Sequence, residues 1–200
     1  MAVLVKGIFV PGETRSRMVD AAVSALQRHG VDGMSFTEVL AASGAARGAI
    51  YHHFPGGKAQ LVAEAAGRNG DDVRQHLAAL PARTPQSVVE QFFSLVRPVL
   101  VKSATGAGCA VAAATVGADG SCAVAQRVFA TWIETLADRL RAAGLDTNDA
   151  TDLATTLITL LEGAHVLCRA AGSVAPFEQA ARTALALTAT RWPGTGEEPA

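Results

Sequence analysis

Hydrophobic residues recur at three- and four-residue steps along most of the chain, and this spacing predicts amphipathic helices. Between residues 14 and 29, for example, Met18, Ala22 and Leu26 fall four apart and form one apolar stripe. Many alanines and few aromatic residues also favour helices over strands. We therefore expect an all-α protein, with further helices over residues 35–43, 46–53, 58–80, 87–103, 109–116, 122–143, 147–171 and 176–191. We expect Gly67 and Gly70 to interrupt the helix over 58–80, the helix over 109–116 to be buried, and Thr147 or Asn148 to cap the helix over 147–171.

The last two predicted helices are apolar over more than one stripe, so each needs partners on more than one side. A monomer of this size offers too few partners, whereas a four-helix bundle formed with a second copy would supply them. The pattern therefore predicts a homodimer. The candidate interface residues are Leu153, Leu157, Leu160, Leu167, Phe177, Ala181, Ala184 and Leu185.

The stretch from Ser35 to Lys58 has the features of two short helices joined by a tight turn. Ser35 and Glu38 are spaced as a capping box, in which each side chain satisfies a backbone N–H at the start of a helix. Gly44 supplies the positive φ that ends a helix, and Pro55 follows the second helix as a stop. Two short helices with basic and aromatic residues on the second are typical of a helix-turn-helix that enters the DNA major groove.

The run Gly44-x-x-Arg47-Gly48-x-Ile50-Tyr51-x-His53-Phe54, followed by a lysine at the start of the next helix, resembles the DNA-binding domain of TetR-family transcriptional regulators. PGGK after YHHF, with GCAVAA in mid-chain, is similar to the LmrA/YxaF-like branch. The resemblance implies an N-terminal three-helix DNA-binding bundle and a larger α-helical ligand-binding and dimerisation domain. We expect these at residues 14–60 and 61–192, with a partly disordered arm at 1–13 and a disordered tail at 193–200.

By this resemblance, the residues that face DNA are Ser35, Thr37, Arg47, Gly48, Ala49, Tyr51, His52, His53 and Lys58. Arg47 can form a bidentate pair with a guanine, whereas Tyr51, His53 and Lys58 match phosphate-binding positions. The competing interpretation is that these rings pack inside the bundle and that Arg47 is an ordinary solvated charge. Two departures from the family pattern stand out: Ala46 removes the usual cap of the second helix, and the longer PGGK loop could displace Lys58.

A regulatory pocket is the second site that the resemblance implies, among the helices between about residues 87 and 171. The candidates are Phe92, Phe93, Val96, Cys109, Phe129, Trp132, Ile133, Leu161 and His165. Aromatic residues with few polar groups suit a small hydrophobic or aromatic effector, and Trp132 and His165 can offer it a hydrogen bond. Apolar residues at helical spacing also suit an ordinary core, which is the alternative for each of them.

Charge is unevenly distributed, although the net charge of the chain is only −1. Residues 1–58 carry more basic than acidic side chains, and the remainder is acidic, which suits a dimer that places one end on DNA. Arg15 and Arg17 near the start of a helix oppose its dipole and suggest an external anion such as a phosphate.

We expect no cofactor, no metal and no catalytic site. The three cysteines form no CxxC pair, and His165 with Cys168, three residues apart, lacks a third metal ligand. The opening residues lack the pattern of a signal peptide, and we expect no apolar run to be long enough to span a bilayer, so the sequence predicts a cytoplasmic protein without a membrane segment.

These features predict a homodimeric repressor that binds a palindromic operator in double-stranded DNA and is released by a small hydrophobic effector. Two alternatives stay open at this point. One is a ligand-independent regulator or an activator that keeps the DNA binding. The other is a helical enzyme or small-molecule carrier that retains a helix-turn-helix, for which Arg47, Tyr51 and Lys58 would have no reason to share one exposed face.

Overall fold

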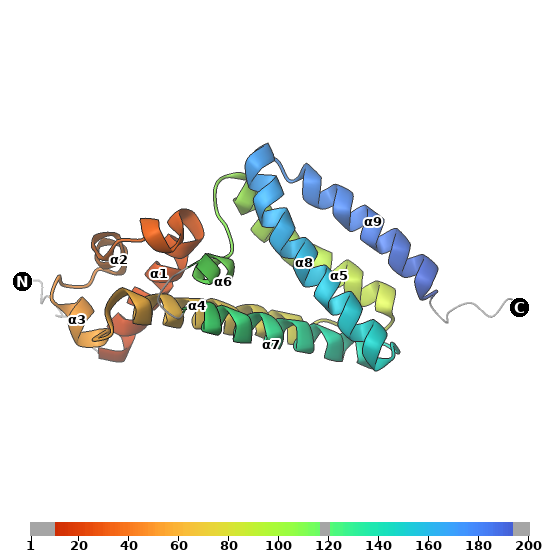
Figure 1. The fold of residues 1–200 in the computed structure, drawn as a ribbon, viewed down its shortest axis with the longest axis horizontal. Helices are drawn as coiled ribbons and strands as arrows, with labels where there is room; N and C mark the ends of the chain where they lie inside the picture. Colours follow the sequence, from red (N-terminus) through yellow and green to blue (C-terminus); the bar gives the residue numbers. More distant parts are fainter. Residues whose placement is uncertain (1–10, 117–120, 194–200) are drawn as a thin grey trace, which may run out of the picture.

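The computed structural model describes residues 11–116 and 121–193, and every regular element in those two ranges is a helix (Figure 1). The elements, in chain order, are α1 (Pro11–Gly33), α2 (Phe36–Ser43), α3 (Ala49–His53), α4 (Gly57–Ala78), α5 (Pro85–Ala104), α6 (Ala110–Ala113), a 3-10 turn η1 (Ala114–Val116), α7 (Ser121–Ala142), α8 (Thr147–Ala171) and α9 (Ala175–Arg191). The all-α prediction is confirmed.

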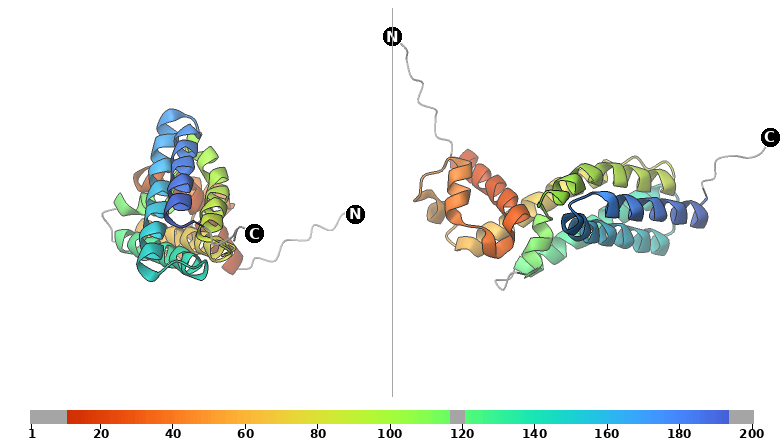
Figure 2. Two further views of the ribbon diagram at one scale, coloured as in Figure 1. Left: turned by 90° about the vertical axis from the view of Figure 1, so that its right-hand side faces the viewer. Right: turned by 90° about the horizontal axis from the view of Figure 1, so that it is seen from above.

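The molecule is elongated, with α1, α2 and α3 at one end and α5, α7, α8 and α9 at the other (Figure 1). Seen from above, the two groups of helices are separate along the long axis (Figure 2). Helix α4 joins them, since it packs on α1 at one end and runs beside α7 along the body. A movement of α4 would therefore be felt at both ends.

The small end has a core of its own. The predicted stripe of α1 is buried at Met18, Ala22 and Leu26, and it packs with Ile50 of α3 and Phe54, which is fully buried. Fully burying apolar side chains of this size contributes about 1.5–3 kcal/mol each. Helices as short as α2 and α3 depend on this burial, because isolated helices of such length are marginal in water.

Helix α1 begins earlier than the sequence predicted. Residues 11–13, assigned to an arm, form its first turn, while residues 1–10 lie outside the described part of the chain. The predicted end at Gly30 is confirmed, because this glycine has φ 68° and interrupts the helical geometry before one further short turn. Of the predicted tail, residues 194–200 also lie outside the described part.

Helix α4 corrects a prediction about its glycines. Gly67 and Gly70 were expected to interrupt it, but the helix is continuous from Gly57 to Ala78. Gly70 is buried where α4 crosses α7, and a Cβ built there would lie 2.5 Å from Val128 Cγ1. The Trp132 indole of α7 donates a hydrogen bond to the Gly70 carbonyl at 2.8 Å. The missing side chain therefore permits a close contact between the two helices.

Side-chain caps set the starts of α5 and α8. Thr84 forms a capping box with Ser87, so α5 starts at Pro85. Asp146, rather than the predicted Thr147 or Asn148, caps α8 by accepting from the Asp149 N–H at 2.9 Å. The predicted helix over 109–116 divides into α6 and η1, and its last residues are exposed instead of buried.

Helix α8 contradicts the expectation that no apolar run could span a membrane. Among the described residues it is the one helix whose length and hydropathy meet that requirement. Its packing offers a different account, because α8 lies against α5, α7 and α9 in the helical body. Only 44% of its most apolar window is buried within the single chain, and Val166 and Leu167 are 67% and 58% exposed.

Candidate DNA-binding face and effector cavity

The first helix of the predicted motif starts as expected at Ser35. Its hydroxyl accepts a hydrogen bond from the Glu38 N–H at 3.1 Å, which caps α2. The other half of the predicted capping box is wrong, because the Glu38 carboxylate pairs with Arg28 at 3.0 Å and with His29 at 3.3 Å on α1. The carboxylate thus ties α2 to α1, while Thr37 points outward and is exposed.

The turn after α2 is built as predicted, but α3 starts later. Gly44 adopts the left-handed conformation at φ 67° and its N–H bonds to the Leu40 carbonyl. Helix α3 begins at Ala49 instead of residue 46, and Gly48 precedes it without a side-chain cap. The reason is local, since neither Ala46 nor Gly48 has a side chain that could cap a helix. Arg47 consequently lies in the turn, just before the helix.

Three predicted base-facing and phosphate-facing residues share one surface. Thr37, Arg47 and Tyr51 all line a hollow of about 600 Å³ between α2 and α3. Tyr51 is 68% exposed and its ring stands edge-on to Phe36, with centroids 6.0 Å apart. Arg47 is exposed and forms no ion pair within the described residues. The alternative in which Tyr51 packs inside the bundle is therefore not what the structure has.

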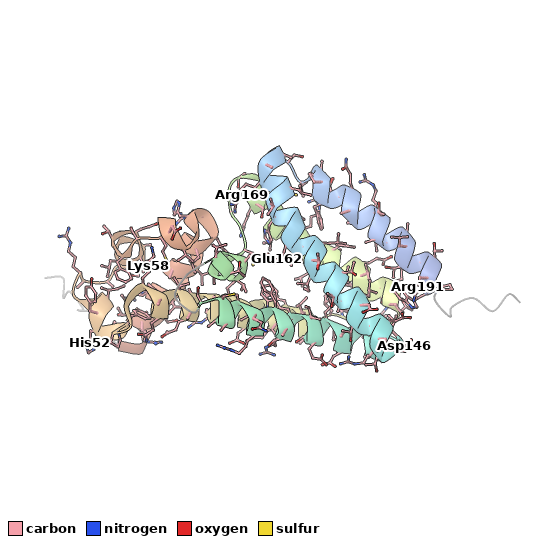
Figure 3. All side chains as sticks on the ribbon, viewed as in Figure 1. His52, Lys58, Asp146, Glu162, Arg169 and Arg191 are labelled. Carbon is pink, nitrogen blue, oxygen red and sulfur yellow. The ribbon has the colours of Figure 1, made fainter. Side chains whose placement is uncertain are left out.

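His52, His53 and Lys58 have three different environments. His52 is exposed and lies at the tip of the molecule formed by α3 (Figure 3). His53 is half-buried, with its ring in an edge contact with Phe54. Lys58 is half-buried too, and its Nζ donates to the Asp32 carbonyl at 3.3 Å. Lys58 would have to leave this carbonyl to reach a phosphate.

Arg15 and Arg17 do not provide the anion site that their positions suggested. Arg15 pairs with Glu64 of α4 at 2.6 Å and lies over the Phe54 ring, and Arg17 pairs with Glu13 at 3.3 Å. Their charges are balanced within the chain. The Arg15–Glu64 pair also fastens α1 to α4 at the junction between the two ends of the molecule.

The helical body contains a cavity of about 340 Å³ beneath α8. The residues that line it are Gln27, Asn69, Asp72, Val73, His76, Leu77, Phe92, Leu95, Val96, Val99, Gly108, Cys109, Trp132, Ile158, Leu161, Glu162 and His165. They come from α1, α4, α5, α7, α8 and the segment that enters α6. Most are apolar, as is usual for a pocket that takes a small hydrophobic molecule.

Six of the nine predicted effector-binding residues line this cavity: Phe92, Val96, Cys109, Trp132, Leu161 and His165. Phe93 instead packs against Phe177 of α9, with ring centroids 5.8 Å apart. Phe129 stands edge-on to Trp132 and is half-buried, as is Ile133, and neither lines the cavity. The predicted set therefore mixed residues of the cavity with residues packed behind it.

Sequence reasoning missed the polar side of the cavity, above all Glu162. Both of its carboxylate oxygens are buried without a hydrogen-bond partner among the described residues. Burial raises the pKa of Glu162 to about 7, against a smaller opposite effect of the Cys109 thiol. A glutamate in the middle of an otherwise apolar helix was the available signal, but helix periodicity alone did not say that it faced inward.

His165 is held in its neutral form. Its Nδ1 lies 2.7 Å from the Ser103 hydroxyl, and burial, with a smaller effect of the Arg169 charge, lowers the pKa of His165 to about 4. It donates or accepts at this contact depending on its tautomer. Within the described residues no group of three His, Cys, Asp or Glu side chains could hold a metal ion.

The predicted dimer residues divide by exposure. Leu157, Phe177 and Ala181 are buried within the single chain, as is Leu153 for the most part. Leu160, Ala184 and Leu185 are half-buried, and Leu167 is 58% exposed. Leu187, which the sequence reading left out, is 65% exposed and shares with Leu160 and Leu167 a broad groove between α8 and α9.

Comparisons with known sequences match both ends of the chain. Residues 18–65 match the family of bacterial regulatory proteins named for TetR, and residues 85–183 match the C-terminal domain of LmrA/YxaF-like transcriptional regulators. An HTH-type transcriptional regulator of Mycobacterium tuberculosis is 32% identical over 175 residues, covering 82% of this chain and 88% of that protein. The HTH-type regulator LmrA of Bacillus subtilis is 25% identical, covering 82% and 91%.

The fold agrees with these sequence matches. A TetR transcriptional regulator from Legionella pneumophila superposes with a TM-score of 0.76 at 22% identity, covering 91% of this chain and 98% of the other. The matched relatives are regulators of transcription, not enzymes. On the helix-turn-helix, the helical body and these matches, the chain belongs to the TetR family of DNA-binding transcriptional regulators, in its LmrA/YxaF-like branch.

Proposed function

We propose that this protein is a cytoplasmic homodimeric repressor that binds a palindromic operator and releases it when a small, largely hydrophobic effector fills the cavity of the helical body. The observation that carries the proposal is Arg47, exposed beside Thr37 and Tyr51 at one end and without an ion pair in the described part of the chain, combined with a cavity at the other end.

At the DNA end, the turn before α3 carries the base-reading side chain. Arg47 is free to form two hydrogen bonds with a guanine in the major groove, and Thr37 stands beside it on α2. Gly48 and Ala49 keep the backbone close to the groove, while Tyr51, His52, His53 and Lys58 are assigned to the phosphates. Ser35 supports α2 through its cap. In the dimer, two copies would enter successive grooves about 34 Å apart.

At the effector end, two elements that hold the DNA-binding helices also line the cavity. Helix α4 contributes Asn69, Asp72, Val73, His76 and Leu77, and α1 contributes Gln27. The Gln27 carbonyl accepts a hydrogen bond from the Gly108 N–H at 2.7 Å, next to Cys109. A ligand that displaces α4 or breaks the Gly108–Gln27 hydrogen bond would therefore change the tilt of α2 and α3.

The dimer contact is assigned to the groove between α8 and α9. Leu167 and Leu187 are largely exposed there, and more than half of the most apolar window of α8 is uncovered in the single chain. Exposed apolar surface of this kind is typical of an interface between copies of a protein. A second copy placed on this groove would complete a four-helix bundle.

A band-shift titration tests the proposal on duplex DNA taken from upstream of the protein's own gene. We expect a shift at moderate salt that a shuffled duplex of the same composition does not give. Compounds that raise the melting temperature of the protein should then reverse the shift, with a coupling of about 1–3 kcal/mol. A shift that no such compound reverses would favour a ligand-independent regulator, and the absence of any sequence-dependent shift would contradict the operator.

A further inference from the structure

Glu162 lies on α8 and lines the cavity of the helical body. In Figure 3 it lies on the stretch of α8 nearest to α6. Neither carboxylate oxygen has a hydrogen-bond partner among the described residues, although both are buried. Leaving a buried polar group unpaired is unfavourable, and native structures do so rarely, so Glu162 requires an explanation.

The carboxyl side chains that line the cavity give it a negative character. Glu162 and Asp72 both line it, and no lysine or arginine is among the lining residues. His165 is neutral, since burial lowers its pKa to about 4 and its Nδ1 is 2.7 Å from the Ser103 hydroxyl. The histidine of α4, His76, places its Nδ1 2.7 Å from the backbone carbonyl of Asp72. Among the described residues, no ion pair joins a basic side chain of the cavity to Glu162.

Arg169, a basic side chain next to the cavity, does not pair with Glu162 either. Arg169 borders, together with Glu162, a smaller hollow next to the cavity, but no ion pair joins them. The Arg169 guanidinium lies over Gly108, where a Cβ would collide with it. The Cys109 thiol interacts with Glu162, and its own pKa is raised by burial and by the glutamate charge. A protonated thiol is a weak donor and leaves the carboxylate unsatisfied.

We propose that the effector is an apolar molecule that carries a protonated amine, and that its N–H groups donate to the Glu162 carboxylate. The inference rests on the proposed role of the cavity as the effector site. An ammonium group would supply both the hydrogen-bond donors and the positive charge that the cavity lacks. A carboxylate ligand of the same shape would be repelled by Glu162 and Asp72.

Glu162 also stands where a bound amine would affect the DNA-binding end. The smaller hollow that it borders is lined by Leu26–Gly30 at the end of α1, and Gln27 lines both spaces. An amine drawn to Glu162 would sit next to the Gly108–Gln27 hydrogen bond, which joins the cavity to α1. The contact between the amine and Glu162 would thus strengthen effector binding and also transmit it to α1.

Three matched probes test this inference: 4-phenylbutylamine, 4-phenylbutanol and 4-phenylbutyrate, titrated into the full-length protein by calorimetry at pH 8. Wild-type protein should bind the amine at least about tenfold more tightly than the alcohol, and the acid most weakly. In Glu162→Gln the preference for the amine should fall to less than about threefold, while the alcohol binds as before. The control is Glu90→Gln on the exposed face of α5, which should behave as wild type.

The pH dependence gives a second readout. Burial raises the pKa of Glu162 to about 7, so the amine should bind more tightly as the pH rises from 6 to 8, and this trend should vanish in Glu162→Gln. The other charged or titratable groups around Glu162 are Cys109, His165 and Arg169, with Asp72 and His76 from α4 and Arg28 and His29 from α1. If the affinity of His76→Gln protein for the amine rises with pH in the same way, His76 is not the group whose titration causes the rise.

The outcomes separate this inference from the proposed function. Equal binding of amine and alcohol, or an amine preference that survives Glu162→Gln, overturns the inference but leaves a hydrophobic effector site intact. Failure of all three probes to bind also overturns it, and the band-shift titration then decides the proposed function on its own. Circular dichroism of Glu162→Gln establishes that the variant is folded before any loss of binding is interpreted.

Discussion

At the scale of single residues, local chemistry accounts for part of the site and tertiary partners for the rest. The cap at Ser35 and the left-handed Gly44 follow from the sequence, because both depend on the nearest backbone groups. The partners of Glu38 do not follow from it, because Arg28 and His29 lie on another helix. Glu162 was not predicted at all, because what distinguishes it is that its buried carboxylate oxygens lack hydrogen-bond partners among the described residues.

Glu162 should make the stability of the protein depend on pH. Its pKa rises from an ordinary 4.5 to about 7 on folding, so the folded state holds a proton that the unfolded state releases in this range. Its contribution to stability is thus present below pH 4.5 and is lost as the pH rises through 7. The lost stability is about 3 kcal/mol.

The measurement is the free energy of unfolding in urea for wild type and Glu162→Gln between pH 5 and pH 8. The variant should gain stability relative to wild type by up to about 3 kcal/mol across this range. His165 has the opposite dependence, because its pKa falls from 6.5 to about 4 on folding, but it is present in both proteins and cancels in the difference. A difference that stays constant with pH would contradict the buried, ionisable Glu162.

At the scale of helices, hydrophobic periodicity predicted the existence of each element but not its ends or its contacts. Thr84 moved the start of α5, and Asp146 took the place of the predicted cap of α8, because both side chains accept hydrogen bonds from backbone N–H groups. Gly70 suggested a weak point in α4, but in the structure this glycine allows a close crossing with α7. Periodicity cannot separate these cases, because the surface that the glycine meets is distant in sequence.

Substituting Gly70 tests that crossing. The Cβ of Gly70→Ala would lie 2.5 Å from Val128 Cγ1, so α4 and α7 must shift, and stability should fall by about 1–3 kcal/mol. Gly67→Ala is the matched control on the same helix, because nothing lies within 4 Å of its Cβ, and it should gain up to about 1 kcal/mol.

Removing the clashing side chain completes the experiment. In the Gly70→Ala/Val128→Ala double variant, the alanine Cβ at position 70 has room, so its cost in thermal stability relative to Val128→Ala alone should largely disappear. If Gly70→Ala is as harmless as Gly67→Ala, the close crossing of α4 and α7 is not what this glycine provides.

At the scale of the whole molecule, the exposed apolar groove between α8 and α9 should determine the oligomeric state. We expect wild type to sediment as a dimer. Leu187→Glu places a charge among Leu160 and Leu167, so this variant should sediment as a monomer at the same concentration. Ala189→Glu, also exposed on α9 but outside the groove, is the control and should remain dimeric. Dimeric Leu187→Glu protein would place the interface elsewhere.

The cavity was predicted only in part because segments that are distant in sequence also line it. Its α5, α7 and α8 residues could be inferred from aromatic and apolar positions, whereas Gln27 and the α4 side chains enter through the packing of distant segments. That packing is what joins the cavity to the helix-turn-helix. It follows from the three-dimensional arrangement of the helices and has no local sequence pattern.

The most direct test of the account is the affinity of Arg47→Ala for the operator, measured by fluorescence anisotropy at fixed salt. Arg47→Ala should lose about 1–3 kcal/mol of operator binding, a loss of about 5- to 150-fold, and change little on a shuffled duplex. Arg127→Ala, an exposed arginine on α7, should bind as wild type. Wild-type operator affinity in Arg47→Ala would contradict the claim that the turn before α3 reads the DNA.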